Sequence, residues 1–369
     1  MRADVVTGTR LDEVDTPALV IELDAFERNL RRMNDAVAGR VRLRTHSKTH
    51  KSAEIARRQV AAGAVGVCCQ KVSEAEAMVA GGIADVLVTN EIVGAQKIER
   101  LAALARRARI GVCVDDAANV AELDAACAAA GSKLEAYVEI DVGTRRCGVA
   151  PGAAAVTLAR EVARHAHLAF AGLQAYQGAA QHVRSASERR ATIDEAAAAA
   201  RATRAAIESA GIRCPRVTGG GSGSFMFEIE SGAFDEIQPG SYIFMDADYA
   251  KNEWAAPLPR FEHALFVLAT VMSRPSPERA VLDAGLKASS VDSGLPLLWR
   301  REGLECRRVS DEHAVIEIAA GASAPALGEK LLLVPGHCDP TVNLYDRYVC
   351  VRDGRVEAIW PIEARGALS

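Results

Sequence analysis

The sequence predicts an α/β protein in which a (β/α)8 barrel of the TIM type is followed by a smaller, mainly antiparallel β-domain. Short apolar runs alternate with Ala-rich amphipathic stretches up to about residue 250, and short β-type runs replace this pattern beyond Asp248. Eight strand–helix alternations fit a barrel better than an open doubly wound sheet, which remains the alternative. No G-x-G-x-x-G segment follows the first apolar run, which argues against a dinucleotide-binding sheet.

The apolar runs are rich in Val, Ile and Leu and are often continuous, as expected for parallel strands covered on both faces. In chain order they are Ala18–Leu23, Val41–Arg44, Val65–Cys69, Val86–Thr89, Ile110–Val114, Leu134–Val142, Leu168–Ala175 and Val217–Gly219. Between them, helices are expected where apolar residues recur at helical spacing, several of them ending at Gly. These stretches are Ala25–Gly39, Ser52–Gly63, Ser73–Gly81, Ala95–Arg107, Ala117–Gly131, Gly152–His165 and Ser185–Gly211.

The β-domain is predicted from runs that are punctuated by Pro, Gly and acidic turns. They are Ala264–Met272, Ala280–Asp283, Ala314–Ile318, Lys330–Val334, Tyr348–Arg352 and Arg355–Trp360. We expect the barrel to comprise residues 15–250 and the β-domain residues 251–369 together with 1–14, with the boundary in Ala250–Pro259.

The composition is that of a globular protein, with 49% hydrophobic and 25% charged residues. A net charge of -4 gives no reason to expect nucleic acid or an anionic membrane as partner. Met1–Asp15 does not resemble a signal peptide, and no apolar run approaches the roughly 20 residues of a membrane span. The 9 cysteines match no zinc-binding or disulfide spacing, so we expect reduced thiols and a cytoplasmic protein.

Functional residues of a barrel lie just past the carboxyl ends of its strands. The most unusual such segment is Arg44–Lys51, where Lys48 follows an apolar strand and is flanked by His46 and His50. A desolvated amine in this position can form a Schiff base with an aldehyde, although the segment can also be read as a basic surface loop.

Two further loops fit a phosphate group. Thr218–Ser224 offers several backbone N–H groups with little side-chain obstruction, and Gln238–Tyr242 adds a second Gly-Ser turn. Each can also be a flexible turn. A Schiff-base lysine and a phosphate cradle at the same rim together point to pyridoxal phosphate.

His337 and Asp339 are two residues apart, so on an extended chain their side chains face the same way. An imidazole and a carboxylate in this arrangement can hold a divalent metal, with water completing its shell. The alternative is a polar turn. On the extended chain, Cys338 would point the opposite way from His337 and Asp339, toward the packed interior.

These motifs, in this order and spacing, resemble those of the D-threonine aldolase and 3-hydroxy-D-aspartate aldolase group. This group is related to the metal-dependent D-serine dehydratases and to the other alanine-racemase-like, fold-type III pyridoxal phosphate enzymes. The resemblance covers nearly the whole chain. Its most specific segments are His46–Lys51, Cys68–Ala75, Asp141–Gly143, Arg146–Gly148, Leu173–Tyr176, Thr218–Gly221, Ser241–Asp246 and His337–Thr341.

The resemblance implies a role for each matching residue. Lys48 would carry the cofactor, Arg146 and Tyr176 would hold its ring, and His337 and Asp339 would bind the metal. The phosphate would lie against Thr218, Gly219, Gly220, Gly221, Ser241 and Tyr242. Weaker candidates for substrate contact are His46, Gln70 and Gln177.

One position separates the aldolases from the dehydratases, which carry cysteine where this chain has Asp339. The harder oxygen ligand favours Mg²⁺ or Mn²⁺, with Zn²⁺ as an alternative. The chain departs from the threonine aldolases at Gln177, where they carry histidine, and at Thr45, where they carry proline. The first difference bears on substrate choice.

The activity implied is retro-aldol cleavage of a D-3-hydroxy amino acid, of the D-threonine or 3-hydroxy-D-aspartate type, to glycine and an aldehyde. The alternatives are β-elimination to a keto acid and ammonia, racemisation, and a non-catalytic pyridoxal phosphate carrier. Such carriers lack a C-terminal β-domain, which here holds His337 and Asp339. The resemblance also implies a homodimer.

Overall fold

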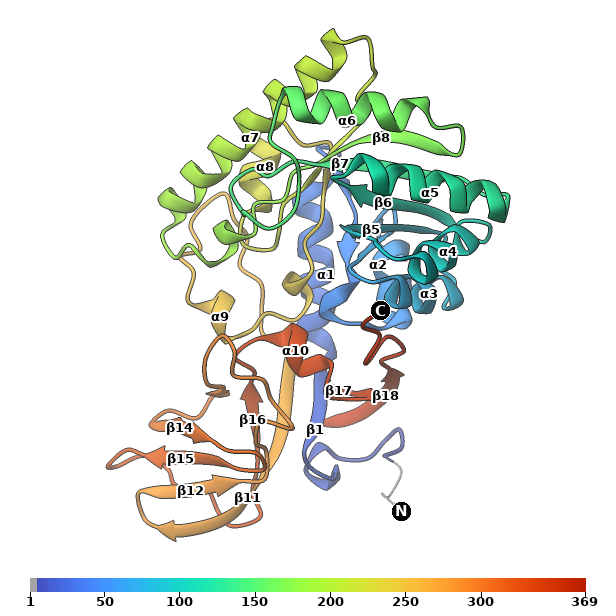
Figure 1. The fold of residues 1–369 in the computed structure, drawn as a ribbon. Helices are drawn as coiled ribbons and strands as arrows, with labels where there is room; N and C mark the ends of the chain where they lie inside the picture. The colour runs from blue at the N-terminus through green and yellow to red at the C-terminus, as the bar shows by residue number, and fades with distance from the viewer. Residues whose placement is uncertain (1–4) are drawn as a thin grey trace.

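The protein, described over residues 5–369 in a computed structural model, contains one closed parallel sheet and one mainly antiparallel sheet (Figure 1). The predicted α/β barrel with a second β-domain is therefore confirmed. Residues 1–4, assigned above to the β-domain, lie outside the described residues.

The parallel sheet is closed into a barrel by one short segment, residues 42–46, which contributes the strands at both of its edges. Its strands are β2 (Arg42–Leu43), β3 (Thr45–His46), β4 (Val67–Cys69), β5 (Asp85–Glu91), β6 (Arg109–Val114), β7 (Leu134–Glu139), β8 (Leu168–Gln174), β9 (Val217–Gly219) and β10 (Glu236–Ile237). β2 pairs with β10 and β3 pairs with β4, and only Arg44 separates β2 from β3. Residues 42–46 therefore join the two edges of the sheet.

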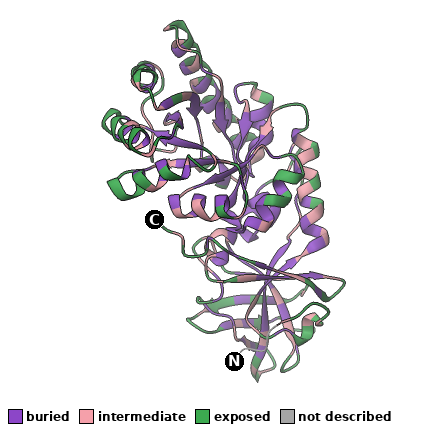
Figure 2. Cartoon of the chain, turned by 90° about the vertical axis from the view of Figure 1, so that its right-hand side faces the viewer, coloured by how far each residue is buried: buried purple, intermediate pink, exposed green. Residues whose placement is uncertain are grey.

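Helices surround this barrel and bury its strands, which Figure 2 shows as a purple interior under partly green helices. They are α1 (Leu23–Val37), α2 (Ala53–Ala61), α3 (Val72–Ala80), α4 (Ala95–Leu104), α5 (Ala117–Ala130), α6 (Ala153–Arg164), α7 (Ala186–Ser209) and α8 (Phe225–Ser231). Short 3-10 helices are η1 (Leu11–Glu13), η2 (Ser47–Thr49), η3 (Ala179–His182) and η4 (Ser241–Ile243). No helix within residues 5–369 has the length and apolar character needed to cross a membrane.

The second sheet has the order β14-β15-β12-β11-β1-β17-β18, with β16 paired to β11 and β13 paired to β16. Its strands are β1 (Ala18–Glu22), β11 (Leu265–Ser276), β12 (Arg279–Leu282), β13 (Leu297–Leu298), β14 (Leu304–Val309), β15 (Ala314–Ile318), β16 (Lys330–Val334), β17 (Arg347–Arg352) and β18 (Arg355–Pro361). All of its pairings are antiparallel except that between β1 and β17. Two short helices, α9 (Ala247–Ala250) and α10 (Cys338–Val342), lie where the two sheets meet (Figure 1).

The expected first barrel strand belongs to the other sheet. β1 pairs with β11, where Ala18 opposes Leu268, and with β17, where Val20 opposes Val349. A strand buried on both faces reads as a continuous apolar run in either sheet, so the pattern does not say which sheet it joins. The remaining barrel position is taken by β10, whose two residues Glu236–Ile237 are too few to show a pattern. β13 and β14 were also not predicted.

A buried ion pair holds the closing strand. Arg44 Nε donates to Glu236 Oε1 at 2.8 Å, and Arg44 Nη1 donates to Asp85 Oδ1 at 2.6 Å. The side chains of Arg44 and Glu236 are 1% and 0% exposed. The guanidinium thus connects residues 42–46 to β10 on one side and to the start of β5 on the other.

We predict that Glu236→Ala lowers the free energy of unfolding by about 3–5 kcal/mol, because it leaves a buried guanidinium with an incomplete set of partners. Urea denaturation followed by circular dichroism measures the loss. Glu317→Ala, which removes the partner of Arg307 at the surface of β15, serves as the control and should leave the midpoint unchanged. Equal midpoints for Glu236→Ala and wild type would contradict the prediction.

Candidate active site

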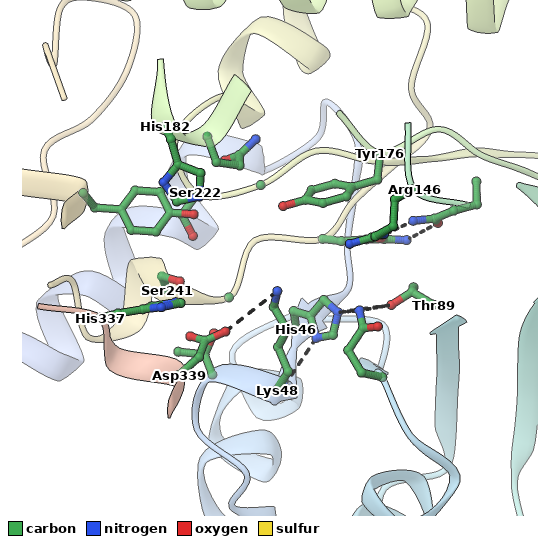
Figure 3. Close-up of a pocket in the computed structure, with 18 residues that line it drawn as sticks. His46, Lys48, Thr89, Arg146, Tyr176, His182, Ser222, Ser241, His337 and Asp339 are labelled. Atoms are coloured by element: carbon green, nitrogen blue, oxygen red, sulfur yellow. Dashed lines mark hydrogen bonds and ion pairs between the residues drawn. The ribbon is translucent and has the colours of Figure 1, made fainter. Parts of the chain in front are cut away.

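A cavity of about 120 Å³ lies at the carboxyl ends of the barrel strands (Figure 3). The start of α10, which connects β16 to β17 of the second sheet, also lines this cavity. Its lining consists of His46, Lys48, Thr49, Gln70, Thr89, Arg146, Gln174, Tyr176, Gln181, His182, Gly221, Ser222, Gln238, Gly240, Ser241, Tyr249, His337 and Asp339. The cavity therefore brings together an amine, several imidazoles and a carboxylate.

Lys48 projects into this cavity from the 3-10 turn η2, directly after β3. Ser47 fixes the turn because its Oγ donates to the Cys68 carbonyl at 2.7 Å. Lys48 Nζ lies 3.8 Å from Asp339 Oδ2. Burial alone would lower the pKa of Lys48, but the carboxylate of Asp339 and the Tyr176 hydroxyl outweigh it, so the pKa is raised. Before any cofactor is attached, the amine is thus protonated and paired.

The two histidines beside Lys48, His46 and His50, differ in position: only His46 lines the cavity. Burial, together with the charge of Lys48, holds the pKa of His46 well below its usual range, so its ring is neutral. His46 lines the cavity, with Nε2 3.1 Å from Thr89 Oγ1 and 3.0 Å from the Gln70 amide nitrogen. His50 does not line the cavity, because its Nδ1 accepts from the Ser52 N–H and its Nε2 contacts Gln59.

Arg146 and Tyr176 enter from the loops after β7 and β8. The first loop turns sharply because Asp141 Oδ1 accepts the N–H groups of Gly143 and Arg145, each at 2.9 Å. The Arg146 guanidinium lies 5.9 Å from the centre of the Tyr176 ring and 4.0 Å from Glu139 Oε1. The two side chains therefore form one wall of the cavity, opposite Lys48 (Figure 3).

A pair of buried carboxyl groups lies behind Arg146. Glu139 ends β7 and is 5% exposed, and both carboxylate oxygens of Glu91 are buried near it. Burial and then the Glu91 carboxylate raise the pKa of Glu139 to about 8. Glu139 therefore holds its proton to a higher pH than a free glutamate does.

Of the two loops predicted to hold a phosphate, only some residues line the cavity. Gly221, Ser222, Gly240 and Ser241 line the cavity, and a Cβ on Gly221 would lie 2.5 Å from Gln181 Oε1. Thr49 Oγ1 is buried there without a hydrogen-bond partner in the described structure, and a Cβ on Gly240 would lie 2.6 Å from it. Small residues and an unpartnered hydroxyl are the features that an anionic group needs.

The other residues assigned to this cradle do not line the cavity. Thr218 bonds to Glu236 and Gln238 inside the barrel, and Gly219 packs against the Ala175 carbonyl. Gly220 lies over Glu228, and the Tyr242 hydroxyl accepts from Gln59. Of these four residues, Tyr242 contacts the lining, since its N–H donates to Ser222 Oγ at 2.9 Å.

Gln177 is also turned away from the cavity. Its Nε2 donates to the Val142 carbonyl at 2.9 Å, and its Oε1 accepts from Thr144 Oγ1 at 3.2 Å. It braces the loop that carries Arg146. Gln70, the other weak candidate, does line the cavity.

His337 and Asp339 face the cavity from the start of α10, so the segment is a helix start and not the extended chain expected. Cys338 lies between them and is fully buried, as predicted. The Asp246 carboxylate sets this position, since Oδ2 accepts the Cys338 N–H and Oδ1 accepts the Tyr249 N–H, both at 2.9 Å. Both side chains line the same cavity as Lys48 of their own chain. Within residues 5–369 no group of three or more metal-ligating side chains occurs.

Sequence reasoning missed Gln181 and Tyr249 and did not assign a role to His182. His182 Nδ1 lies 2.8 Å from Asp248 Oδ2, and Arg184 binds the same carboxylate. Asp248 thus engages one ring nitrogen and leaves Nε2 for the cavity. For Gln181 and His182 the signal available was the polar segment after β8, but its short 3-10 helix η3 could not be predicted; Tyr249, in α9, left no such signal.

Comparison with known proteins identifies the family of the chain. Residues 21–248 match the family described as alanine racemase, N-terminal domain, and residues 264–351 match the putative serine dehydratase domain. The chain therefore belongs to the alanine racemase N-terminal domain family. Within it, the chain is 50% identical over 361 residues to a D-threonine aldolase of Arthrobacter sp., which covers 97% of this chain and 95% of the relative.

Two further relatives agree. A 3-hydroxy-D-aspartate aldolase of Paracoccus denitrificans (strain Pd 1222) is 49% identical over 373 residues, covering 97% of this chain and 94% of the relative. The crystal structure of D-threonine aldolase from Filomicrobium marinum superposes with a TM-score of 0.97 at 52% identity, covering 100% of both chains. The aldolase group predicted from the motifs is confirmed.

We predict that Glu139→Gln becomes progressively more stable relative to wild type from about pH 5 to about pH 8. In this interval the unfolded chain ionises Glu139 while the folded protein keeps it protonated, so folding binds a proton and stability falls as pH rises. Glutamine removes this dependence. Melting temperatures of both proteins across the range measure it, and a difference that does not change with pH would contradict the assignment.

Proposed function

We propose that the protein is a pyridoxal phosphate- and divalent-metal-dependent aldolase that cleaves D-3-hydroxy amino acids to glycine and an aldehyde. The observation that carries this proposal is the single cavity in which Lys48 Nζ lies 3.8 Å from Asp339 Oδ2, beside His337. The relatives named D-threonine aldolase and 3-hydroxy-D-aspartate aldolase supply the reaction class, that of a carbon–carbon lyase.

The residues present fit the cofactor. Lys48 supplies the amine, and the unpartnered Thr49 hydroxyl with Gly221, Ser222, Gly240 and Ser241 would hold the phosphate. Arg146, Tyr176 and His46 would surround the ring. Pyridoxal phosphate, when bound, supplies the ring that stabilises the electron pair left on Cα.

The donor set also fits a divalent metal. His337 offers an imidazole nitrogen and Asp339 a carboxylate oxygen, a combination that suits Mg²⁺ or Mn²⁺ better than a thiolate-containing set and also accommodates Zn²⁺. A bound cation would polarise the hydroxyl group of the substrate.

We assign the proton acceptor to His182. Asp248 holds Nδ1 as the donor nitrogen, so Nε2 keeps its lone pair and takes the hydroxyl proton. The hydroxyl becomes the carbonyl of the aldehyde, the Cα–Cβ bond breaks, and its electron pair remains on Cα. A proton added at Cα gives glycine. The neutral ring of His46 does not compete for the hydroxyl proton, because it already bonds to Thr89.

We also propose a homodimer, which the family resemblance supports. In this arrangement each chain keeps its own amine and metal pair, since His337 and Asp339 line the cavity that contains Lys48 of the same chain.

We predict that Lys48→Ala abolishes the visible absorbance of the lysine-linked cofactor and reduces cleavage to background, because no other amine lines the cavity among the described residues. Absorbance spectra after reconstitution with pyridoxal phosphate measure this. Lys71→Ala, which removes a nearby lysine outside the cavity lining, is the control and should keep the spectrum. An unchanged spectrum for Lys48→Ala would refute the cofactor assignment.

We predict that wild type forms glycine and an aldehyde from at least one of D-threonine, 3-hydroxy-D-aspartate and D-phenylserine when Mg²⁺ or Mn²⁺ is present. A chelator and Asp339→Ala should each lower the rate about 100-fold or more while the cofactor absorbance persists. Coupled assays for glycine and for the aldehyde measure the rates.

Asp311→Ala removes an exposed aspartate in the turn between β14 and β15; it is the matched control and should retain activity. A keto acid with ammonia would establish the alternative, β-elimination. A bound cofactor without turnover of any substrate would favour a carrier, and full activity of Asp339→Ala with chelator would exclude the metal pair.

A further inference from the structure

Asp292 lies beside the proposed metal pair but belongs to a different segment. It is in the loop between β12 and β13, and its Oδ2 is 2.8 Å from His337 Nδ1. That contact occupies one ring nitrogen of His337 and leaves Nε2 for the cavity that His337 lines.

Asp292 is itself held in place. Ser290 Oγ donates to its Oδ1 at 2.7 Å, and Ser293 Oγ donates to its Oδ2 at 3.1 Å. The carboxylate is therefore oriented before any ligand arrives, although the side chain is 49% exposed.

The loop is also fastened to α10. The Ser290 N–H donates to Thr341 Oγ1 at 3.1 Å, and that hydroxyl donates to the His337 carbonyl at 2.8 Å. Gly294 lies so close to Gly336 that a Cβ on Gly336 would be 2.0 Å from the Gly294 carbonyl oxygen. These contacts fix the distance between the loop and the residue that precedes His337.

We propose that Asp292 is a positioning residue for the metal, which fixes the ring of His337 so that Nδ1 carries the proton and Nε2 presents its lone pair. A carboxylate on the second nitrogen of a metal-binding imidazole sets its tautomer and raises its basicity. The proposal rests on the function proposed above. It assigns Asp292 no direct contact with the metal, because its near oxygen already accepts from the imidazole.

The test is Mn²⁺ binding to the pyridoxal phosphate-loaded, metal-depleted protein, measured by loss of the electron paramagnetic resonance signal of free Mn²⁺. Asp292→Ala should raise the dissociation constant about 10- to 100-fold. Asp292→Asn keeps an oxygen that accepts from Nδ1, so it should recover at least half of this loss on a logarithmic scale. Cofactor absorbance and melting temperature should stay at the wild-type values in both variants, and Asp311→Ala is the control.

The outcomes separate the two proposals. If wild type does not bind Mn²⁺, the metal part of the proposed function fails. If wild type binds and Asp292→Ala binds equally well, the role of Asp292 is overturned while the metal pair stands. If Asp292→Asn is as impaired as Asp292→Ala, Asp292 acts by its charge or as a ligand, and the positioning role is likewise overturned.

Discussion

The arrangement of the active site depends on one buried carboxylate, that of Asp246. It is 0% exposed and accepts backbone N–H groups from Tyr249 and Cys338, so a single side chain sets the start of both α9 and α10. α9 brings Tyr249 to the cavity, and α10 brings His337 and Asp339. An apolar residue at this position would leave two donors unpaired at the junction of the sheets, where the positions of His337 and Asp339 are set.

Much of the fold could be predicted from the sequence, because parallel strands covered on both faces leave continuous apolar runs. The same property explains the error at residues 18–22, since burial on both faces does not identify the neighbours of a strand. β10 was missed because it has only two residues. It is held in place by the pairing of Glu236 with Arg44, which is 192 residues away in the chain. Charge pairing at that separation has no local pattern.

The site residues that could be predicted are those that directly follow a barrel strand. Lys48, Arg146 and Tyr176 follow β3, β7 and β8, and the barrel geometry alone brings such positions to one rim. The conformation of the Gly-rich loop Thr218–Ser224 was harder to predict. Glycine indicates that other atoms approach the backbone closely, but it does not indicate which atoms these are. Gly221 lines the cavity, whereas Gly219 packs against the Ala175 carbonyl, just past the end of β8. His182 and Tyr249 lie in the short helices η3 and α9, which have too few residues to show a periodicity in the sequence.

The position of β1 limits how the protein can be divided. This strand precedes the barrel in the chain, yet it lies between β11 and β17, which both follow the barrel. During synthesis its two neighbours emerge only after the whole barrel has left the ribosome, so the second sheet is completed last. For the same reason, a chimera that exchanges only the residues after the barrel would graft β11 and β17 onto a foreign β1. The unit to exchange between relatives is residues 265–361 together with 18–22.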